Sequence, residues 1–267
     1  MITYAASGPR ATKHETRATK KTAMTPELRP SLLLLPGLLC DHALWEPQIA
    51  ALSDTCVPWV ADLKRDDSFA SMAARVLAEA PAQRFALAGL SMGGYVAMEI
   101  MRQAPERVTR LALLDTRATL DTPEETARRQ DFMRLAQTEH GFTPITTRML
   151  PLLVHPARAK DEPLIRVIRV MAERIGVDVY LRQQNAIMSR PDFRPDLPRV
   201  ACPTLILCGR EDALTPLERH EEMVRLMPTA RLTIIEQCGH LSTLERPYEV
   251  NVALRDWLVV RDPLRML

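Results

Sequence analysis

The stretch Phe85-Ala-Leu-Ala-Gly-Leu-Ser-Met-Gly-Gly94 places Ser91 in a Gly-x-Ser-x-Gly pattern, between an apolar run and a helix-compatible segment. A serine hydroxyl is a poor nucleophile until its Oγ is lifted toward a general base, and a sharp strand-to-helix turn does this. Such a turn forces the serine toward positive φ and leaves room only for glycine at the flanking positions. The stretch therefore predicts a strand, a tight turn carrying a nucleophilic Ser91, and a helix. An ordinary glycine-rich loop is the alternative.

Short apolar runs alternate with helix-length amphipathic segments along the chain, which is typical of a mostly parallel sheet with helices on both faces. We expect about six strands, over residues 32–35, 56–60, 85–88, 111–114, 204–208 and 232–235. Helices are expected over residues 43–52, 69–79, 92–103, 217–226 and 248–259. The expected fold class is therefore α/β.

The alternation breaks once, between Thr116 and Ala201, where the periodicity is helical and no strand is indicated. Helices are expected there over residues 123–138, 144–153 and 163–188, the last interrupted near Gly176. An insertion of this size is typical of a helical cap over the carboxyl edge of a parallel sheet, where active sites lie. We therefore expect a core of residues 30–116 and 201–267 and a cap of residues 117–200.

Several side chains of the expected cap could line a substrate pocket. The apolar candidates could equally pack among the cap helices, and they are Phe132, Met133, Phe142, Met149, Met171 and Met188. Four arginines could pair with a substrate carboxylate, although arginine on a helix is more often solvated, and these are Arg117, Arg128, Arg148 and Arg190.

The composition, with 46% hydrophobic and 25% charged residues, is that of a globular protein. The formal net charge of +2 is unevenly distributed, because residues 1–29 carry six Lys or Arg against Glu15 and Glu27. We expect residues 1–29 to form a disordered tail, with a transit peptide or an over-extended start before Met24 as alternatives. The remainder gives no indication of nucleic-acid binding, and no apolar run is long enough to span a membrane.

The cysteines are odd in number and form no Cys-x-x-Cys pair: Cys40, Cys56, Cys202, Cys208 and Cys238. Together with the missing secretory signal, this indicates free thiols in the cytoplasm and argues against a bound metal. Cys40 lies beside a loop expected to line the active site, where a small apolar filler is the simplest interpretation.

A serine nucleophile needs a histidine as base, and the sequence offers His14, His42, His140, His155, His220 and His240. His14 lies in the tail, His220 falls in a helix expected to face solvent, and His140 and His155 lie among polar or turn residues of the expected cap. His240 follows the last expected strand directly, on a loop at its carboxyl end. His240 is therefore the predicted base.

Two aspartates compete to orient this histidine. Asp212 follows the strand 204–208 and lies on the same edge of the sheet as His240, whereas Asp115 ends the strand 111–114. We favour Asp212, because an acid after the penultimate strand, between the serine and the histidine in chain order, is the usual arrangement in hydrolases of this topology. Asp115 is then expected to cap the entry to the insertion, and Glu211 is the neighbouring alternative.

Attack on a carbonyl carbon creates an oxyanion that backbone N–H groups can stabilise. The amide of Met92, directly after the nucleophile, is expected to supply one donor. The second is expected from the Leu38 amide in Pro36-Gly-Leu-Leu-Cys40, where Gly37 would let the chain bend toward the serine.

The chain resembles the α/β-hydrolase superfamily, in the branch of small bacterial esterases, lactonases and carbon–carbon hydrolases that includes 3-oxoadipate enol-lactonases. Four stretches carry the resemblance, and they lie within 35–45, 89–94, 208–216 and 238–247. The family often has His-Gly where this chain has Pro36-Gly37. A common N-terminal β-hairpin has no counterpart before residue 30, which is consistent with about six strands.

The resemblance implies that Ser91, His240 and Asp212 cleave a small carboxylic ester or lactone through an acyl-enzyme, with no cofactor. A carbon–carbon hydrolase of ring-cleavage products and a perhydrolase are alternatives on the same fold. A non-catalytic ligand-binding protein is the alternative from another class, and its mark would be an eroded triad. The expected partner is a small-molecule substrate, and the sequence carries no signal for an oligomeric state.

Overall fold

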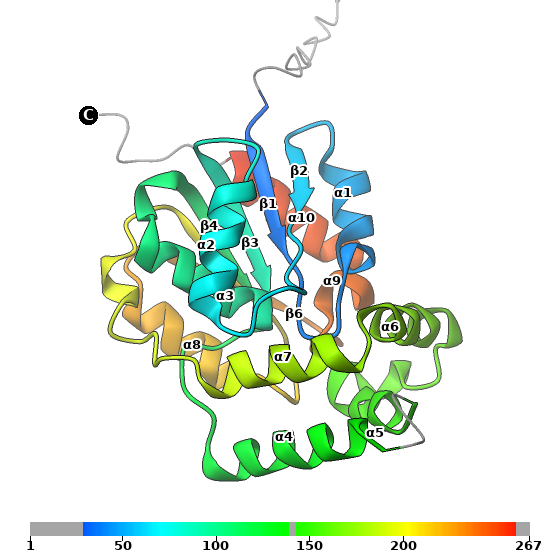
Figure 1. The fold of residues 1–267 in the computed structure, drawn as a ribbon. Helices are drawn as coiled ribbons and strands as arrows, with labels where there is room; N and C mark the ends of the chain where they lie inside the picture. Colours follow the sequence, from blue (N-terminus) through cyan, green and yellow to red (C-terminus); the bar gives the residue numbers. More distant parts are fainter. Residues whose placement is uncertain (1–28, 139–142, 260–267) are drawn as a thin grey trace, which may run out of the picture.

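The computed structural model describes residues 29–138 and 143–259 and contains one sheet of six parallel strands. The strands are β1 Ser31–Leu35, β2 Val57–Val60, β3 Phe85–Leu90, β4 Val108–Leu114, β5 Thr204–Gly209 and β6 Ala230–Ile235. Their order in the sheet is β2-β1-β3-β4-β5-β6 (Figure 1). The six predicted strands are confirmed, although β4 begins three residues earlier than predicted because polar Thr109 and Arg110 conceal its start, where Arg110 pairs with Ala86 of β3.

Helices pack on both faces of the sheet, as predicted. On one face, three helices share a core with Leu33 and Leu87, and they are α2 Phe69–Glu79, α3 Met92–Gln103 and α8 Leu217–Leu226. On the other face, two helices share a second core with Leu32 and Leu34, and they are α1 Glu46–Leu52 and α10 Pro247–Val259. Successive strand residues thus point to opposite faces, and both faces are buried, which explains the nearly continuous apolar runs of the strands.

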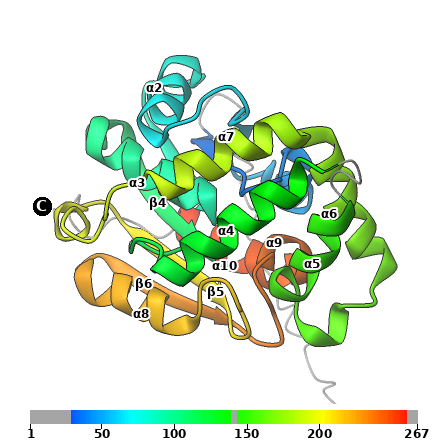
Figure 2. The same ribbon diagram turned by 60° about the horizontal axis from the view of Figure 1, so that its bottom comes forward.

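The chain between β4 and β5 contributes helices and turns. These helices are α4 Pro123–Ala136, α5 Thr143–Leu153, α6 Glu162–Ile175 and α7 Val177–Met188. Gly176, with φ of +76°, separates α6 from α7 at the predicted interruption. Figure 2 shows α4 and α7 side by side in front of the sheet, with α5 and α6 next to them. These helices therefore cover the edge where the strands end.

Two smaller elements differ from prediction. The predicted helix 43–52 is a 3-10 turn, His42–Trp45 (η2), followed by α1, whose first turn contains Pro47. A short helix, Ser242–Glu245 (α9), begins two residues after His240 and was not predicted. The predicted tail lies outside the described residues except for Arg29, and so does Phe142.

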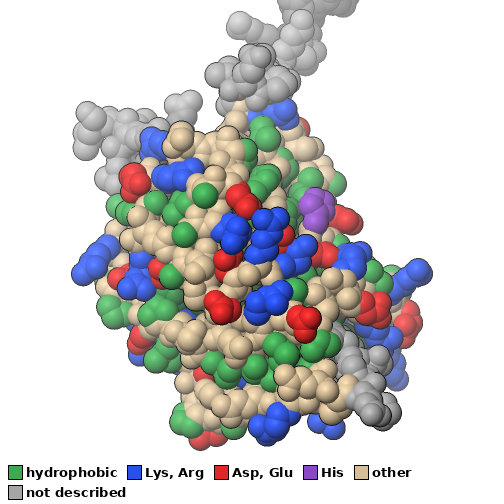
Figure 3. Space-filling view, viewed as in Figure 1, with side chains coloured by type: hydrophobic (Ala, Val, Ile, Leu, Met, Phe, Trp, Pro, Cys, Tyr) green, Lys and Arg blue, Asp and Glu red, His purple; other side chains and the backbone are tan. Residues whose placement is uncertain are grey.

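Acidic and basic side chains are mixed on the face shown in Figure 3, without a large patch of either sign. Several of them pair, for example Arg75 with Asp66 at 2.7 Å. Within the part of the chain that the structure describes, no helix combines the length and the apolar character needed to cross a membrane.

Candidate active site

Ser91 lies in the turn between β3 and α3 with φ of 55°, a backbone conformation that residues other than glycine rarely adopt. The flanking glycines make this turn possible. A Cβ on Gly89 would lie 2.3 Å from the carbonyl oxygen of Gly93, and a Cβ on Gly93 would lie 2.1 Å from that of Leu35. Backbone closeness therefore requires glycine at both positions, and the predicted tight turn is present.

The structure brings Ser91, His240 and Asp212 together at the carboxyl edge of the sheet. His240 Nε2 lies 2.9 Å from Ser91 Oγ, and His240 Nδ1 lies 2.9 and 2.8 Å from the two carboxylate oxygens of Asp212. The turn after β6 carries His240, whose amide donates to the carbonyl of Leu153 at the end of α5. The three side chains thus form one hydrogen-bonded chain.

The Asp212 carboxylate is held by several donors besides His240. The amides of Leu214 and Thr215 donate to Oδ1 at 2.8 and 2.9 Å, and the Thr215 hydroxyl donates to Oδ2 at 2.6 Å. Burial works against the charged carboxylate, but His240 and these hydrogen bonds prevail and lower the pKa of Asp212. Asp212 is therefore ionised near neutral pH.

Burial also works against a charged imidazolium, yet the pKa of His240 is raised above its ordinary value. The largest opposing influence is Asp212, through its charge and its hydrogen bond, with further contributions from Asp115 and Glu245. A raised pKa increases the basicity of Nε2, the atom that faces Ser91. Proton transfer from the hydroxyl to this nitrogen is correspondingly easier.

Asp115 does not cap the insertion, which corrects our expectation. Its side chain is fully buried and accepts hydrogen bonds from the Gly209 amide at 3.0 Å and from the amide and hydroxyl of Ser242. Its backbone is left-handed, with φ of 46°. Asp115 thus turns back toward the loops after β5 and β6, and Thr122 caps α4 instead.

Two acidic side chains accept hydrogen bonds from the loop that carries His240. Glu211 accepts from the Cys238 amide at 3.0 Å, so it does not face the imidazole and the alternative acid is ruled out by geometry. The buried Glu245 accepts from the amides of Gly239 at 2.9 Å and His155 at 2.7 Å. Glu245 had no local signal in the sequence, because it lies in a short polar helix whose burial depends on the helices before β5.

The amides of Leu38 and Met92, the expected oxyanion donors, make no hydrogen bond to another group of the described chain. The bend of the loop after β1 differs from our expectation. Leu39, with φ of 61°, is the left-handed residue of this loop, whereas the φ of Gly37 is not positive. Gln183 of α7 holds the loop, since its buried Oε1 accepts from the Leu39 amide at 3.2 Å.

His220 is fully buried, not solvent-facing as predicted. Its Nε2 accepts from the amide of Thr116 at 3.1 Å, and its Nδ1 lies 3.3 Å from the carbonyl oxygen of Pro216. Burial lowers the pKa of His220 to about 4, so the ring is neutral near pH 7. The hydroxyl of Thr116 in turn donates to the carbonyl of Ser91 at 2.8 Å. His220 therefore supports the turn that carries the serine.

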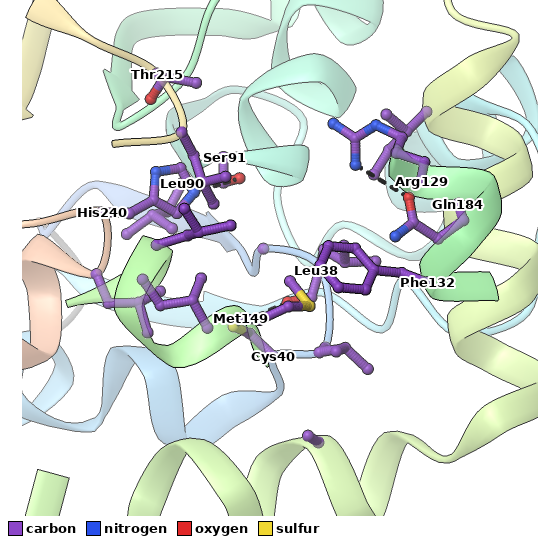
Figure 4. A pocket seen from close by; sticks show the side chains of 18 of the residues that line it. Leu38, Cys40, Leu90, Ser91, Arg129, Phe132, Met149, Gln184, Thr215 and His240 are labelled. Atoms are coloured by element: carbon purple, nitrogen blue, oxygen red, sulfur yellow. Dashed lines mark hydrogen bonds between the residues drawn. The ribbon is translucent and has the colours of Figure 1, made fainter. Parts of the chain in front are cut away.

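A largely apolar pocket opens beside Ser91 and His240 (Figure 4). Three of the predicted apolar candidates line it, namely Phe132, Met149 and Met171. Met133 packs among the helices instead, and Met188 is not part of the lining. Cys40 also lines the pocket, and burial raises the pKa of its thiol to about 12, which leaves it uncharged.

The four arginines considered for a substrate carboxylate, or otherwise for solvent exposure, divide into two kinds. Arg128 and Arg148 are exposed, and Arg128 also lines the pocket. Arg117 and Arg190 are buried, which corrects the prediction, because both pair with Asp121 at the start of α4. In the described ranges, no group of three or more His, Cys, Asp or Glu side chains could hold a metal ion.

Comparison with known proteins agrees with this fold. Residues 32–254 match the alpha/beta hydrolase family. The chain is 29% identical over 237 residues to a pimeloyl-[acyl-carrier protein] methyl ester esterase of Nitrosomonas europaea, covering 82% of this chain and 91% of that protein. It is 28% identical over 250 residues to a putative carbamate hydrolase RutD of Escherichia coli O127:H6, covering 86% and 91%.

Two solved structures are similar to this one over most of the chain. A thermophilic esterase from Thermogutta terrifontis has a TM-score of 0.78 at 30% identity, covering 86% of this chain and 89% of that one. The enol-lactonase from Burkholderia xenovorans LB400 has a TM-score of 0.78 at 23% identity, covering 86% and 91%, and shares the fold. Since the family match spans most of the chain, this protein is a hydrolase that belongs to the alpha/beta hydrolase family.

Proposed function

We propose that this protein cleaves a small carboxylic ester or lactone through an acyl-enzyme formed on Ser91. The observation that carries the proposal is the continuous chain of hydrogen bonds from Ser91 through His240 to Asp212, at 2.9 and 2.8 Å. An apolar pocket opens at the hydroxyl end of this chain. A nucleophile, its base and the group that orients the base are thus aligned beside a space for an acyl group.

In the proposed reaction, Ser91 Oγ attacks the carbonyl carbon while its proton passes to His240 Nε2. The amides of Leu38 and Met92 donate to the oxyanion, and each such donor contributes about 3 kcal/mol by analogy with other hydrolases. His240 then returns the proton to the alkoxide leaving group as the carbon–oxygen bond breaks. Water attacks the acyl-enzyme by the same route and restores the serine.

The helices between β4 and β5 are proposed to act as a cap, residues 117–200, over a core of residues 30–116 and 201–267. Side chains from α4, α5 and α6 line the pocket, namely Phe132, Met149 and Met171. A mainly apolar lining favours a small substrate with a hydrocarbon acyl portion. The names of the esterase relatives support an ester as the cleaved group.

The test compares the wild type with Ser91→Ala on p-nitrophenyl acetate and p-nitrophenyl butyrate. We expect a burst of one nitrophenol per active site from the wild type and at least about a 1,000-fold lower rate for the variant. Equal rates for the two proteins would rule out serine catalysis. A panel of lactones and ring-cleavage dienoates then separates an esterase from a lactonase and from a carbon–carbon hydrolase.

A further inference from the structure

One wall of the pocket is charged, and the charged residues that line it are Arg117, Glu125, Arg128 and Arg129. Three of these belong to a cluster with Asp121 and Arg190, which do not line the pocket themselves. Asp121 accepts hydrogen bonds from three guanidinium groups, those of Arg117, Arg129 (2.6 Å) and Arg190 (2.8 Å). Glu125 accepts two more from Arg117, at 2.7 and 2.8 Å. The cluster therefore joins three cations to two anions.

The cluster is short of negative charge, because its two carboxylates face three guanidinium groups. The Nε atoms of Arg117 and Arg190 are buried without an acceptor among the described residues. Burial works against the Asp121 carboxylate, but the guanidinium groups around it hold the pKa of Asp121 well below its usual range, so it stays ionised. An unbalanced positive charge in a mostly apolar pocket is costly unless an anion meets it.

Arg129 presents this excess charge to the pocket. Its Nε donates to Asp121, and its Nη1 donates to Oε1 of Gln184 at 3.0 Å. Within the described part of the chain, the other three of its five N–H groups have no acceptor. Arg129 lines the pocket and its side chain is 21% exposed, so these donors can reach a bound molecule.

Figure 4 shows Arg129 and Ser91 on opposite sides of the pocket, with Phe132 and Leu38 along one side of the space between them. A molecule that spans the pocket would thus have its reacting group at the serine, a hydrocarbon middle and a second end at the guanidinium. A guanidinium binds a carboxylate through two parallel charged hydrogen bonds, which fixes orientation as well as charge.

We propose that Arg129 binds a carboxylate on the acyl portion of the substrate, so that the natural ester or lactone is anionic. This inference rests on the proposed function, because it assigns a carboxylate-binding role to the end of the same pocket that lies away from Ser91. The test uses the monomethyl esters of succinate, glutarate and adipate, each compared with an uncharged methyl ester of similar length. The rate of hydrolysis is measured from the protons that the reaction releases.

The wild type is expected to prefer at least one of the anionic esters, as measured by kcat/KM. In Arg129→Met this preference is expected to fall about 10- to 100-fold, the range for losing a charged hydrogen-bonded pair, and Arg129→Lys to restore part of it. Arg134→Met is the matched control, because Arg134 lies on the same helix, is exposed and does not line the pocket. Its preference is expected to stay within about twofold of the wild type.

No preference in the wild type, or equal losses on charged and uncharged esters in Arg129→Met, would overturn the proposal. Binding gives a second measurement that does not depend on turnover. Calorimetric titration of monomethyl glutarate into Ser91→Ala and into the double variant with Arg129→Met is expected to show weaker binding in the double variant. Should no ester be hydrolysed, the proposed function fails, and this titration still decides whether Arg129 holds a carboxylate.

Discussion

The carboxyl group of Asp115 accepts hydrogen bonds from both the amide and the hydroxyl of Ser242, 127 residues further along the chain. Because Asp115 also accepts from the Gly209 amide, one side chain joins the end of β4 to the loops that carry Asp212 and His240. Burial and the nearby charge of Asp212 raise the pKa of Asp115 well above its ordinary value, while His240 and the hydrogen bonds from Ser242 and Gly209 act in the opposite direction. Asp115 is therefore suited to position the two loops.

Replacing Asp115 by alanine is expected to lower kcat about 10- to 100-fold with little change in KM, because three buried donors lose their acceptor and the loops shift. Asp115→Asn keeps an acceptor oxygen and is expected to recover much of the loss. Steady-state kinetics on p-nitrophenyl butyrate measure both effects. Wild-type kcat values in both variants would show that Asp115 has no positioning role.

The raised pKa of His240 predicts the acid limb of the pH profile. The base must be neutral to accept the serine proton, and protonated His240 accumulates below its pKa, so kcat/KM should rise with pH through an apparent pKa above 6.5. In Asp212→Asn this limb should move to lower pH, and kcat should fall on the order of 10⁴-fold. Rates measured from about pH 5 to about pH 9 test this. An acid limb that stays in place in Asp212→Asn would contradict it.

Glycine is needed for different reasons at Gly93, where the backbone of another segment lies too close for a side chain, and at Gly176, where φ is positive. A Cβ at Gly93 would lie 2.1 Å from a backbone oxygen, so Gly93→Ala should destabilise the fold by about 3 kcal/mol. Gly176 has φ of +76°, but a Cβ there would meet no atom within 4 Å, so Gly176→Ala should cost only about 1 kcal/mol of backbone strain. Urea unfolding of both variants gives the comparison, and a larger loss at Gly176 would refute the steric argument.

The sequence permitted prediction of the sheet and of the three hydrogen-bonded residues, because each follows an apolar strand that ends at the same edge. Ser91, Asp212 and His240 therefore converge once the strands that precede them are parallel and lie near one another in the sheet, with only β4 between β3 and β5. Local pattern is sufficient for such positions. It was sufficient for the break at Gly176 as well, where periodicity stops and glycine supplies the positive φ.

The remaining site residues could not be read from local pattern. His220 lies in a helix rich in charged side chains, and its burial depends on which side of α8 meets the sheet. Arg117 and Arg190 are far apart in sequence and become buried only because both reach Asp121. Gln183 has the appearance of an ordinary polar helix residue until α7 packs against the loop after β1. These positions depend on tertiary contacts that single-sequence propensities do not contain.

The tertiary contacts of Gln183 lead to a testable prediction. Its Oε1 accepts from the Leu39 amide, and its Nε2 donates to the carbonyl of Leu63 at 3.3 Å, so it fixes the loop that carries the Leu38 amide. Gln183→Leu should lower kcat about tenfold while KM changes less, because the loop loses a buried acceptor. Gln130→Leu, at an exposed position of α4, is the control and should keep wild-type kinetics. A change in KM alone in Gln183→Leu would argue against an effect on the loop.

His220 predicts how stability depends on pH. Because its pKa is about 4 in the folded chain and 6.5 as the ordinary value, only the unfolded chain binds this proton between these limits. The neutral His220 ring makes its full contribution to the free energy of unfolding above about pH 6.5. This contribution is lost as the pH falls, by about 3 kcal/mol down to about pH 4. His240 has the opposite sign, since its raised pKa stabilises the folded state as pH falls, and this gain is complete below about pH 6.5.

The two histidines therefore act in different pH windows, and a single variant separates them. His220→Gln keeps an acceptor for the Thr116 amide but cannot be protonated, so it should lose less stability than the wild type between pH 7 and pH 5. Urea unfolding at these two pH values measures the difference, in which the carboxylates common to both proteins cancel. Equal losses in the two proteins would mean that His220 is hydrated enough in the folded state to accept a proton.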